Sequence, residues 1–225
     1  MSRSVIFDTE TTGLFPDAGD RVIEVACIEL MRDLPTGLTY HALIDPERDV
    51  PEESTRVHGF TREHLVGKPR FADIADAFLE FVGGDPLIAH NAAFDFGFMN
   101  AELGRVGRGR LHESRMVCTL VMAKTRFPGL PNSLDALCRR YGIDLSERTS
   151  HNALLDCRLL SDVYVELTGG RQAALLLPNE ALASHAVAYT MIGERRPVLI
   201  EVDEATLARH AAFVSRLKEP VWLTR

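Results

Sequence analysis

The sequence has no excess of positive charge that could bind a polyanion, and it has few cysteines that could form disulfides. Its 225 residues carry 25 Lys and Arg against 32 Asp and Glu, a formal net charge of −7. This excludes proteins that wrap duplex DNA through excess positive charge, although metal ions and a few arginines can still bind nucleic acid locally. The four cysteines are far apart and form no CxxC pair. We therefore expect free thiols in a reducing compartment, with no disulfide framework or zinc knuckle.

Long apolar runs and a leader-like segment are also missing. No stretch approaches the roughly 20 apolar residues that cross a bilayer, and the first residues run directly into a strand-like pattern, so we expect no signal peptide and a cytoplasmic location. The sequence has neither internal repeats nor a low-complexity tract. Apolar residues make up 46% of the chain, so a sizeable core can be buried. The length suits one domain with an appendage or two small domains.

Strand-like and helix-like patterns alternate over the first two thirds of the chain. Runs rich in β-forming residues predict strands over 4–10, 21–31 and 38–46, and the short connections between them predict an antiparallel meander. Residues 115–127 are predicted to form a strand turn or the start of a helix. Together the elements predict an α/β fold with a mixed central β-sheet flanked by helices. Helical spacing or an apolar run identifies the remaining elements: helices over 70–84, 91–103, 133–142 and 152–167, and a buried strand over 86–90.

Gly169 and Gly170 mark the expected end of this α/β domain, and a C-terminal extension follows. Periodicity is weaker after this point, and residues 196–202 are a candidate short strand. Asp203 is expected to cap a final helix. The apolar stripe of that helix would comprise Leu207, Ala211, Val214 and Leu217.

Two carboxylates, Asp8 and Glu10, stand where the first apolar run ends. In a strand, residues two apart point to the same face with Cα atoms roughly 6.5 Å apart. Asp8 and Glu10 would therefore project together, and Thr9 would point the other way. Convergent carboxylates on a rigid strand suit a hard divalent cation such as Mg²⁺ or Mn²⁺. A solvated strand end with incidental charges is the alternative, and this motif alone does not separate the two.

Asp95 stands between Phe94 and Phe96 at the start of a predicted helix, after a second apolar strand. An acid in such surroundings is a poor structural choice unless it is paired. The alternative is a carboxylate near the helix N-terminus, where the helix dipole favours negative charge.

Asp156 begins the buried stripe of the 152–167 helix, where an unpaired charge is costly. His151 lies five residues earlier, about 140° away around an ideal helix. It must therefore come from the loop before the helix, with Ser150 or Asn152 as the cap. A loop histidine suits proton transfer, although an ordinary surface histidine is the alternative. The stripe that Asp156 begins continues through Leu159, Leu160 and Val163.

These motifs, in this order, resemble those of the DEDDh 3′→5′ exonucleases. They are D-x-E in VIFDTETTGL, the aspartate in AHNAAFDFGFM and H-x-x-x-x-D in HNALLD, and the resemblance spans residues 5 to about 167. The tyrosine-bearing branch of the family has Tyr where this chain has Asn152, so the histidine branch is the better match. The resemblance implies a ribonuclease H-like exonuclease fold and two divalent ions, Mg²⁺ or Mn²⁺.

The resemblance also implies roles for the five motif residues. Asp8 would bridge both ions, and Glu10 and Asp156 would complete the site that holds the attacking water. Asp95 would support the second ion through waters, and His151 would take the proton from the water. The substrate would be a frayed 3′ end, which unpairs more easily when mispaired. Residues expected to contact that end are Thr11, Leu14, His58, Asn91 and Phe94; Leu14 and Phe94 could equally be core residues.

Within the family, the chain resembles the proofreading (epsilon) subunits of bacterial DNA polymerase III. HGFT, residues 58–61, and the C-terminal helix with its late tryptophan carry this resemblance. It implies an exonuclease domain over 1–168, a linker over 169–184 and a polymerase-binding segment over 185–225. The implied partners are the polymerase catalytic (alpha) subunit, a sliding clamp and a small theta-like subunit.

The QAALLL stretch after the predicted boundary is a candidate clamp-binding peptide, although it lacks the aromatic residue of many such peptides. A plain apolar linker is the alternative. The candidate clamp contacts are Gln172, Leu175, Leu176 and Leu177. Two other functions compete with proofreading. One is a stand-alone exonuclease for RNA trimming or DNA repair, and the other is a structural subunit with an inactive site. The complete acid set and His151 argue against the latter.

Overall fold

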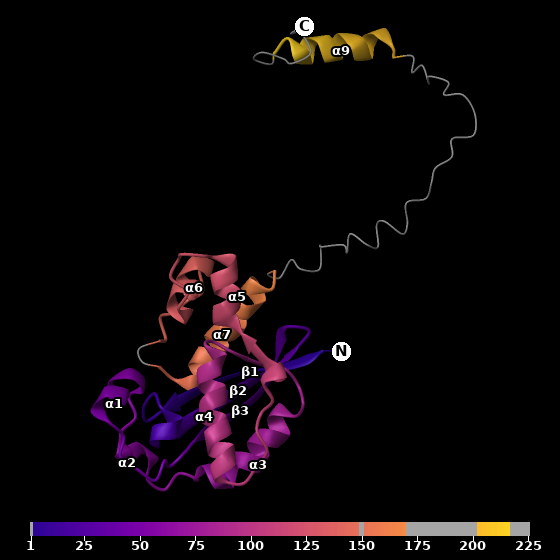
Figure 1. Cartoon of the computed structure of the whole chain (residues 1–225). Helices are drawn as coiled ribbons and strands as arrows, with labels where there is room; N and C mark the ends of the chain where they lie inside the picture. Colours follow the sequence, from indigo (N-terminus) through magenta and orange to yellow (C-terminus); the bar gives the residue numbers. More distant parts are fainter. Residues whose placement is uncertain (1, 149–150, 170–201, 217–225) are drawn as a thin grey trace, which may run out of the picture. The chain divides into compact units, whose positions relative to one another are not determined.

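The computed structural model describes residues 2–148, 151–169 and 202–216 (Figure 1). The chain divides into two units, Met1–Leu177 and Pro178–Arg225. Residues 170–184 of the predicted linker lie outside the described residues, and so do the candidate clamp contacts Gln172, Leu175, Leu176 and Leu177. Among the residues described, no helix has the length and apolar character needed to cross a membrane.

A five-stranded mixed sheet forms the centre of the first unit, in the order β3-β2-β1-β4-β5. Strands β1 (Arg3–Thr11), β2 (Val22–Met31) and β3 (Leu34–Leu43) form the predicted antiparallel meander. Strands β4 (Leu87–Ala89) and β5 (Met116–Cys118) continue the sheet on the other side of β1, and both pairings are parallel. β1 is therefore the strand at which the sheet changes from antiparallel to parallel pairing.

The long helices lie close to the predicted ranges: α3 (Phe71–Val82), α4 (Ala92–Arg105), α6 (Leu134–Tyr141) and α7 (Ala153–Leu167). Residues 115–127 were predicted to form a strand turn or the start of a helix. They form a strand and then a helix, because β5 leads directly into α5 (Thr119–Arg126). The sequence did not reveal two shorter helices, α1 (Glu52–His58) and α2 (Arg62–Leu65), or the 3₁₀ turns η1 (Pro16–Ala18) and η2 (Glu113–Arg115). Such short segments cannot show an apolar period over several turns.

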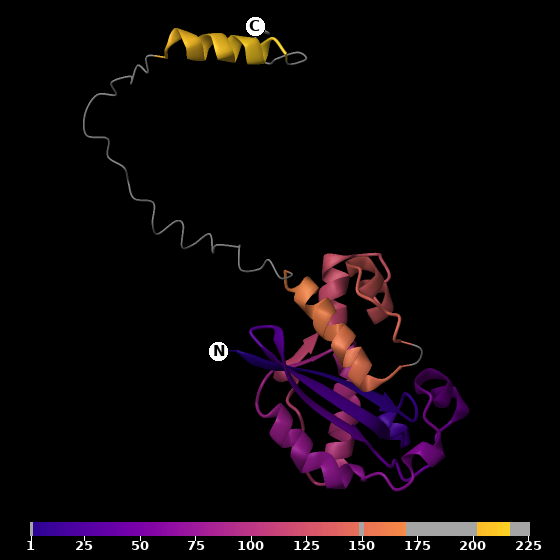
Figure 2. The same ribbon diagram turned by 180° about the vertical axis from the view of Figure 1, so that it is seen from behind.

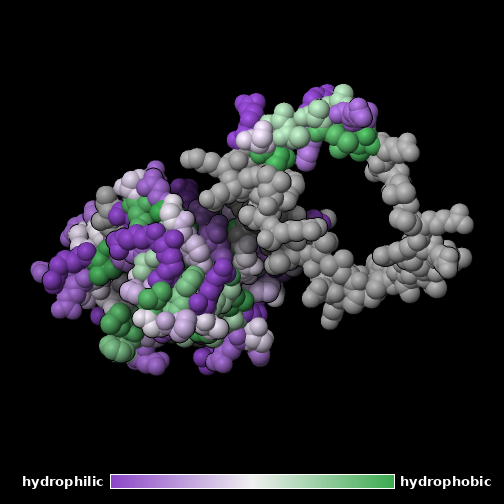
Figure 3. Space-filling model, turned by 90° about the horizontal axis from the view of Figure 1, so that it is seen from above, coloured by the Kyte–Doolittle hydropathy of each residue, from purple (hydrophilic) through white to green (hydrophobic). Residues whose placement is uncertain are grey.

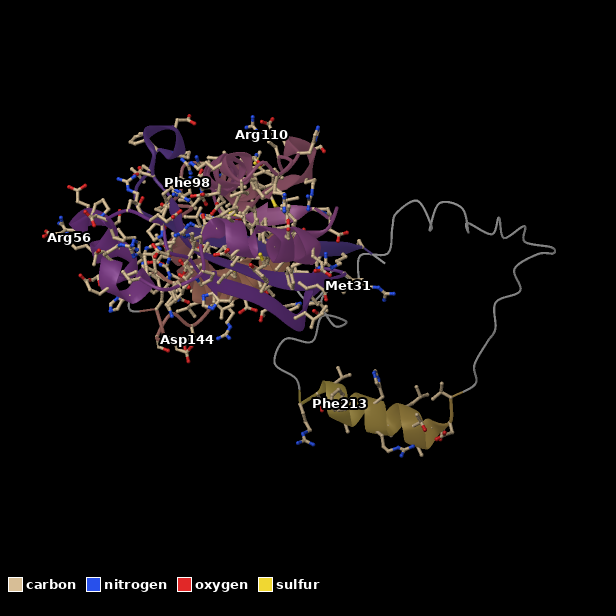
Figure 4. All side chains as sticks on the ribbon, turned by 90° about the horizontal axis from the view of Figure 1, so that it is seen from below. Met31, Arg56, Phe98, Arg110, Asp144 and Phe213 are labelled. Atoms are coloured by element: carbon tan, nitrogen blue, oxygen red, sulfur yellow. The ribbon has the colours of Figure 1, made fainter. Side chains whose placement is uncertain are left out.

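Side-chain alternation along β1 builds a core on each face of the sheet. Val5 and Phe7 belong to the cluster that includes α3 and α4, whereas Ile6 belongs to the cluster that includes α6 and α7. Helix α4 crosses in front of the strands in Figure 1 and α7 crosses in front of them in Figure 2, which is seen from behind. Figure 4 labels Phe98 of α4, which is fully buried in the first cluster.

An ion pair fastens α4 to the start of β2. Glu102 of α4 is fully buried and accepts hydrogen bonds from the Arg21 guanidinium at 2.7 and 3.0 Å and from the Val22 N–H at 3.2 Å. Three donors satisfy a carboxylate that would otherwise be costly to bury. Because α4 also carries Asp95, this contact helps to fix Asp95 against the sheet.

In the second unit, helix α9 spans Glu204–Val214. The predicted cap is confirmed, because the Asp203 carboxylate accepts a hydrogen bond from the Thr206 N–H at 2.8 Å. Leu207 and Phe213 are both more than half exposed, and apolar side chains cover part of this helix (Figures 3 and 4). Leu217, the last residue of the predicted stripe, and residues 196–201 of the candidate strand lie outside the described residues.

Candidate functional site

The site lies where β1 extends beyond its parallel neighbour. Among the described residues, β4 pairs with β1 at Val5 and Ile6 only, so the last residues of β1 have no strand partner there on that side. His90 follows β4 directly, and Thr119 follows β5. In open α/β sheets, ligands bind outside the carboxyl ends of parallel strands, where the strand order reverses. Here that position is the end of β1 that carries Asp8 and Glu10.

Asp8 and Glu10 share the face of β1 that packs against α7. They alternate in register with Ile6, which belongs to the α7 core cluster. Ligand atoms of Glu10, His151 and Asp156 lie within 4.8 Å of one another. Asp8 lies with His151 and Asp156 in the wall of a cleft of about 320 Å³. The structure thus brings four of the five predicted catalytic residues to one face.

Asp95 reaches the site from the other face of the sheet. It lies in the first turn of α4 and is buried. Its Oδ1 accepts hydrogen bonds from the Thr9 hydroxyl at 2.8 Å and the Thr9 N–H at 3.2 Å. Thr9 does point away from Asp8 and Glu10, as strand alternation predicts, and its contact with Asp95 ties α4 to the middle of the carboxylate motif.

His151 lies in the loop before α7, as the helical geometry predicts. Its backbone N–H donates to the Val57 carbonyl of α1 at 3.1 Å, and the Asn152 side chain caps α7 by accepting from the Leu155 N–H at 3.1 Å. The imidazole Nδ1 is 3.2 Å from Asp156 Oδ2. The side chain is 48% exposed, so it is accessible to a substrate or a water.

Glu24 lies beside the candidate site and was not singled out by the sequence analysis. It lies opposite Glu10 in the β1–β2 ladder and is fully buried. Its carboxylate accepts hydrogen bonds from the Asn152 amide and the Ala153 N–H, each at 3.0 Å, and its Oε1 is 2.7 Å from His41 Nε2. Glu24 therefore holds the start of α7 against the sheet and fixes where His151 and Asp156 lie.

Arg148 is the second residue that the sequence analysis missed. Its guanidinium donates to both oxygens of Asp156, with Nε–Oδ1 at 2.6 Å and Nη2–Oδ2 at 2.7 Å. It also bonds to Asp135, and its Nη2 is 2.9 Å from His151 Nδ1. This arginine places a positive charge among the acids.

Burial and mutual repulsion shift the pKa values of these acids. Burial, then the charge of Asp95, raises the pKa of Asp8 well above its usual value. Burial, then the charge of Glu24, raises the pKa of Glu10 to about 8, and burial raises that of Asp95 to about 7. Burial also acts to raise the pKa of Asp156, but the hydrogen bonds from Arg148 are the largest opposing effect and the pKa is lowered. The positive charge near Asp8 is thus too small to compensate the negative charge of the surrounding acids. Carboxylate oxygens of this kind fit hard divalent cations.

Without metal, stability should fall as the pH rises from about 4.5 to about 8. Because the Glu10 pKa is raised to about 8, the folded chain retains a proton there that the unfolded chain has lost. The slope from Glu10 alone is at most about 1.4 kcal/mol per pH unit. Urea unfolding in EDTA across this range should show it, and Glu10→Gln should flatten it. The exposed glutamate Glu53 offers the control Glu53→Gln, and equal slopes in both variants would contradict the prediction.

The five predicted substrate contacts differ in burial and in hydrogen bonding, and none of them lines the cleft that contains Asp8. The Thr11 hydroxyl donates to the Gly13 carbonyl at 2.6 Å and so holds the turn after β1. Leu14 is 67% exposed, whereas Phe94 is half-buried and packs on Phe98 with ring centroids 4.8 Å apart. Asn91 is exposed at the start of α4.

His58, the remaining predicted substrate contact, is buried at the C-terminal end of α1. Its Nδ1 accepts from the Phe60 N–H at 3.1 Å, and its ring stacks on Phe60. Its Nε2 has no hydrogen-bond partner within the part of the chain that the structure describes. Burial lowers the pKa of this imidazole.

Known proteins match this chain over most of its length. The Exonuclease family (RNase T) matches residues 5–164. The chain belongs to this exonuclease family. It is 42% identical over 221 residues to DNA polymerase III subunit epsilon of Rickettsia felis, which covers 96% of both chains, and 37% identical over 226 residues to that of Escherichia coli, which covers 97% of this chain and 86% of that one.

The fold of this exonuclease is also that of a solved structure. Exonuclease X in complex with 5′ overhanging duplex DNA matches with a TM-score of 0.58 and 24% identity, over 75% of this chain and 91% of that one. The mixed five-stranded sheet with flanking helices is therefore the ribonuclease H-like fold that the motifs predict. The chain is a metal-dependent 3′→5′ exonuclease of the DNA polymerase III epsilon type.

Proposed function

We propose that this exonuclease removes mispaired nucleotides from DNA primer 3′ ends as the proofreading subunit of a replicative polymerase, by two-metal-ion hydrolysis. The observation that carries the proposal is the convergence of ligand atoms of Glu10, His151 and Asp156 within 4.8 Å, with Asp8 in the wall of the same cleft as His151 and Asp156. It occurs in a chain that matches polymerase epsilon subunits over nearly its full length.

In this proposal, Asp8, Glu10 and Asp156 hold two divalent ions, Mg²⁺ or Mn²⁺, and Asp95 supports the second. When bound, the cations activate the attacking water and stabilise charge on the leaving 3′ oxygen. His151 takes the proton from that water, since it is exposed and lies on the loop beside Asp156. Asn152 and Glu24 keep the loop and the helix start in place while the proton moves.

The 3′ end would enter along the two hollows that meet at His90 and Ser133. Both residues line the catalytic cleft and also a neighbouring hollow of about 750 Å³ that contains Lys124. Contacts in these hollows would bind the phosphate backbone and the faces of the bases, and they would not distinguish one base sequence from another. Selectivity would then come from the lower cost of unpairing a mismatch. The proposed contacts to the end are Thr11, Leu14, His58, Asn91 and Phe94.

The C-terminal part decides between proofreading and a stand-alone exonuclease. In this proposal residues 185–225, which include α9, bind the polymerase catalytic subunit, and Gln172 with Leu175, Leu176 and Leu177 contacts a sliding clamp. The exposed Leu207 and Phe213 of α9 support a binding role for this segment. A small theta-like subunit is a further proposed partner. An enzyme that trims RNA has no need for such a segment.

A primer whose last base is mispaired should be shortened roughly tenfold faster than the matched primer. The reason is that a free-energy cost of unpairing lower by about 1.4 kcal/mol corresponds to a tenfold higher rate. Single-turnover cleavage of the two primers, with Mg²⁺ and with or without the polymerase catalytic subunit, measures the ratio. A single-stranded primer is the control, since it has no pair to break. Equal rates on both primers, or faster cleavage of an RNA end, would favour the stand-alone reading.

A further inference from the structure

We propose that Arg148 is a resident counter-cation that occupies Asp156 and His151 in the metal-free enzyme and competes with the divalent ion for Asp156. The inference rests on the proposed metal site. It adds a positioning residue that keeps the site assembled but inactive until metal is bound.

The contact with Asp156 is a two-point fork. Nε and Nη2 of Arg148 approach the two carboxylate oxygens at 2.6 and 2.7 Å. The Arg148 side chain is 10% exposed and that of Asp156 is 5% exposed. Such bidentate pairs are among the stronger charge-assisted contacts, and here each oxygen already accepts a short charged hydrogen bond. A cation that binds Asp156 must therefore displace at least part of this fork.

The contact between Arg148 and His151 occupies the ring nitrogen that would otherwise accept a proton. A guanidinium has donors only, so the 2.9 Å contact between Arg148 Nη2 and His151 Nδ1 makes Nδ1 the acceptor. In the neutral ring the proton then lies on Nε2. Neither ring nitrogen retains a free lone pair for a water molecule. While Arg148 is engaged, His151 cannot act as the general base.

Asp135 gives Arg148 a second anchor. It lies in the first turn of α6, lines the same cleft and bonds to Nη1 of Arg148. The guanidinium can therefore leave Asp156 and His151 and still keep a carboxylate partner at the edge of the cleft.

The test is Mn²⁺ binding by calorimetry to the full chain, for wild type and for Arg148→Ala. Removing the competitor should tighten binding roughly three- to tenfold, because apparent affinity is reduced by the fraction of protein in a competent state. Metal-free Arg148→Ala should also melt a few degrees lower, since Asp156 loses its buried partner. Arg148→Lys retains the charge without the fork and should bind Mn²⁺ with intermediate affinity, which keeps the test valid if the alanine variant folds poorly.

Arg139→Ala is the matched control. Arg139 is exposed, belongs to the same helix as Asp135 and contacts that residue at 3.6 Å, but it has no bond to Asp156. Its removal changes the net charge equally and should leave Mn²⁺ affinity within about twofold, the effect of a screened surface charge. Unchanged or weaker binding in the Arg148 variants would overturn the inference, as would equal tightening in Arg139→Ala. Absence of Mn²⁺ binding in the wild type would instead overturn the proposed metal site itself.

Discussion

Asp8→Asn should reduce hydrolysis of a single-stranded DNA primer by on the order of a thousandfold or more, because several kcal/mol of stabilisation by the bound cations depends on this carboxylate. Asp8 lines the candidate cleft together with His151 and Asp156. The amide is isosteric with the acid and preserves packing, but it is a poor ligand for a hard cation. Single-turnover cleavage with saturating Mg²⁺ measures the loss.

The same substitution should leave the metal-free protein as stable as the wild type or make it more stable. Burial and the neighbouring acids, Asp95 first among them, raise the Asp8 pKa well above normal, so its charge opposes folding when no cation is bound. Thermal melting in EDTA near pH 8 tests this. Asp17 is exposed in η1, and Asp17→Asn is the control. Retention of more than a tenth of the activity, or a large loss of stability, would contradict the assigned role of Asp8.

Much of the fold could be predicted because its main elements repeat their patterns over several turns or residues. In α3, Ile74, Phe78 and Val82 recur at helical spacing, all three are buried, and Gly83 with φ +48° ends the helix. α1 and α2 offer no such signal, since each has a single buried residue, His58 and Leu65 respectively. The sequence therefore predicted the sheet and its covering helices but not the short helices, although the Val57 carbonyl of α1 holds His151.

The sequence likewise predicted some residues of the candidate site and missed others. Strand alternation placed Asp8 and Glu10 on one face, and helical geometry placed His151 in the loop before α7. Glu24 was missed although it interrupts the apolar run VIEVACI, the same kind of signal that singled out Asp95. Arg148 has no such signal, because it lies in a loop and its contacts with Asp135 and Asp156 arise from tertiary structure alone.

His151→Gln should lower the maximal rate roughly a hundredfold or more, the usual contribution of a general base. The concentration of Mn²⁺ that gives half the maximal rate should change little, because the acids would hold the ions. The fork between Arg148 and Asp156 does not depend on His151, so its competition with metal persists in the variant. Titrating the rate with Mn²⁺ separates the two parameters.

This experiment matters because the geometry permits a second role for the histidine. A nitrogen of His151 lies within 4.8 Å of ligand oxygens of Glu10 and Asp156, close enough for all three to hold one ion. If His151 were a ligand, the glutamine variant would require at least about tenfold more Mn²⁺ and recover much of its rate at saturation, as lost ligands do. The position of His151 on an exposed loop favours the base. His41→Gln is the control, since His41 bonds the same Glu24 network from β3 and lies outside the cleft.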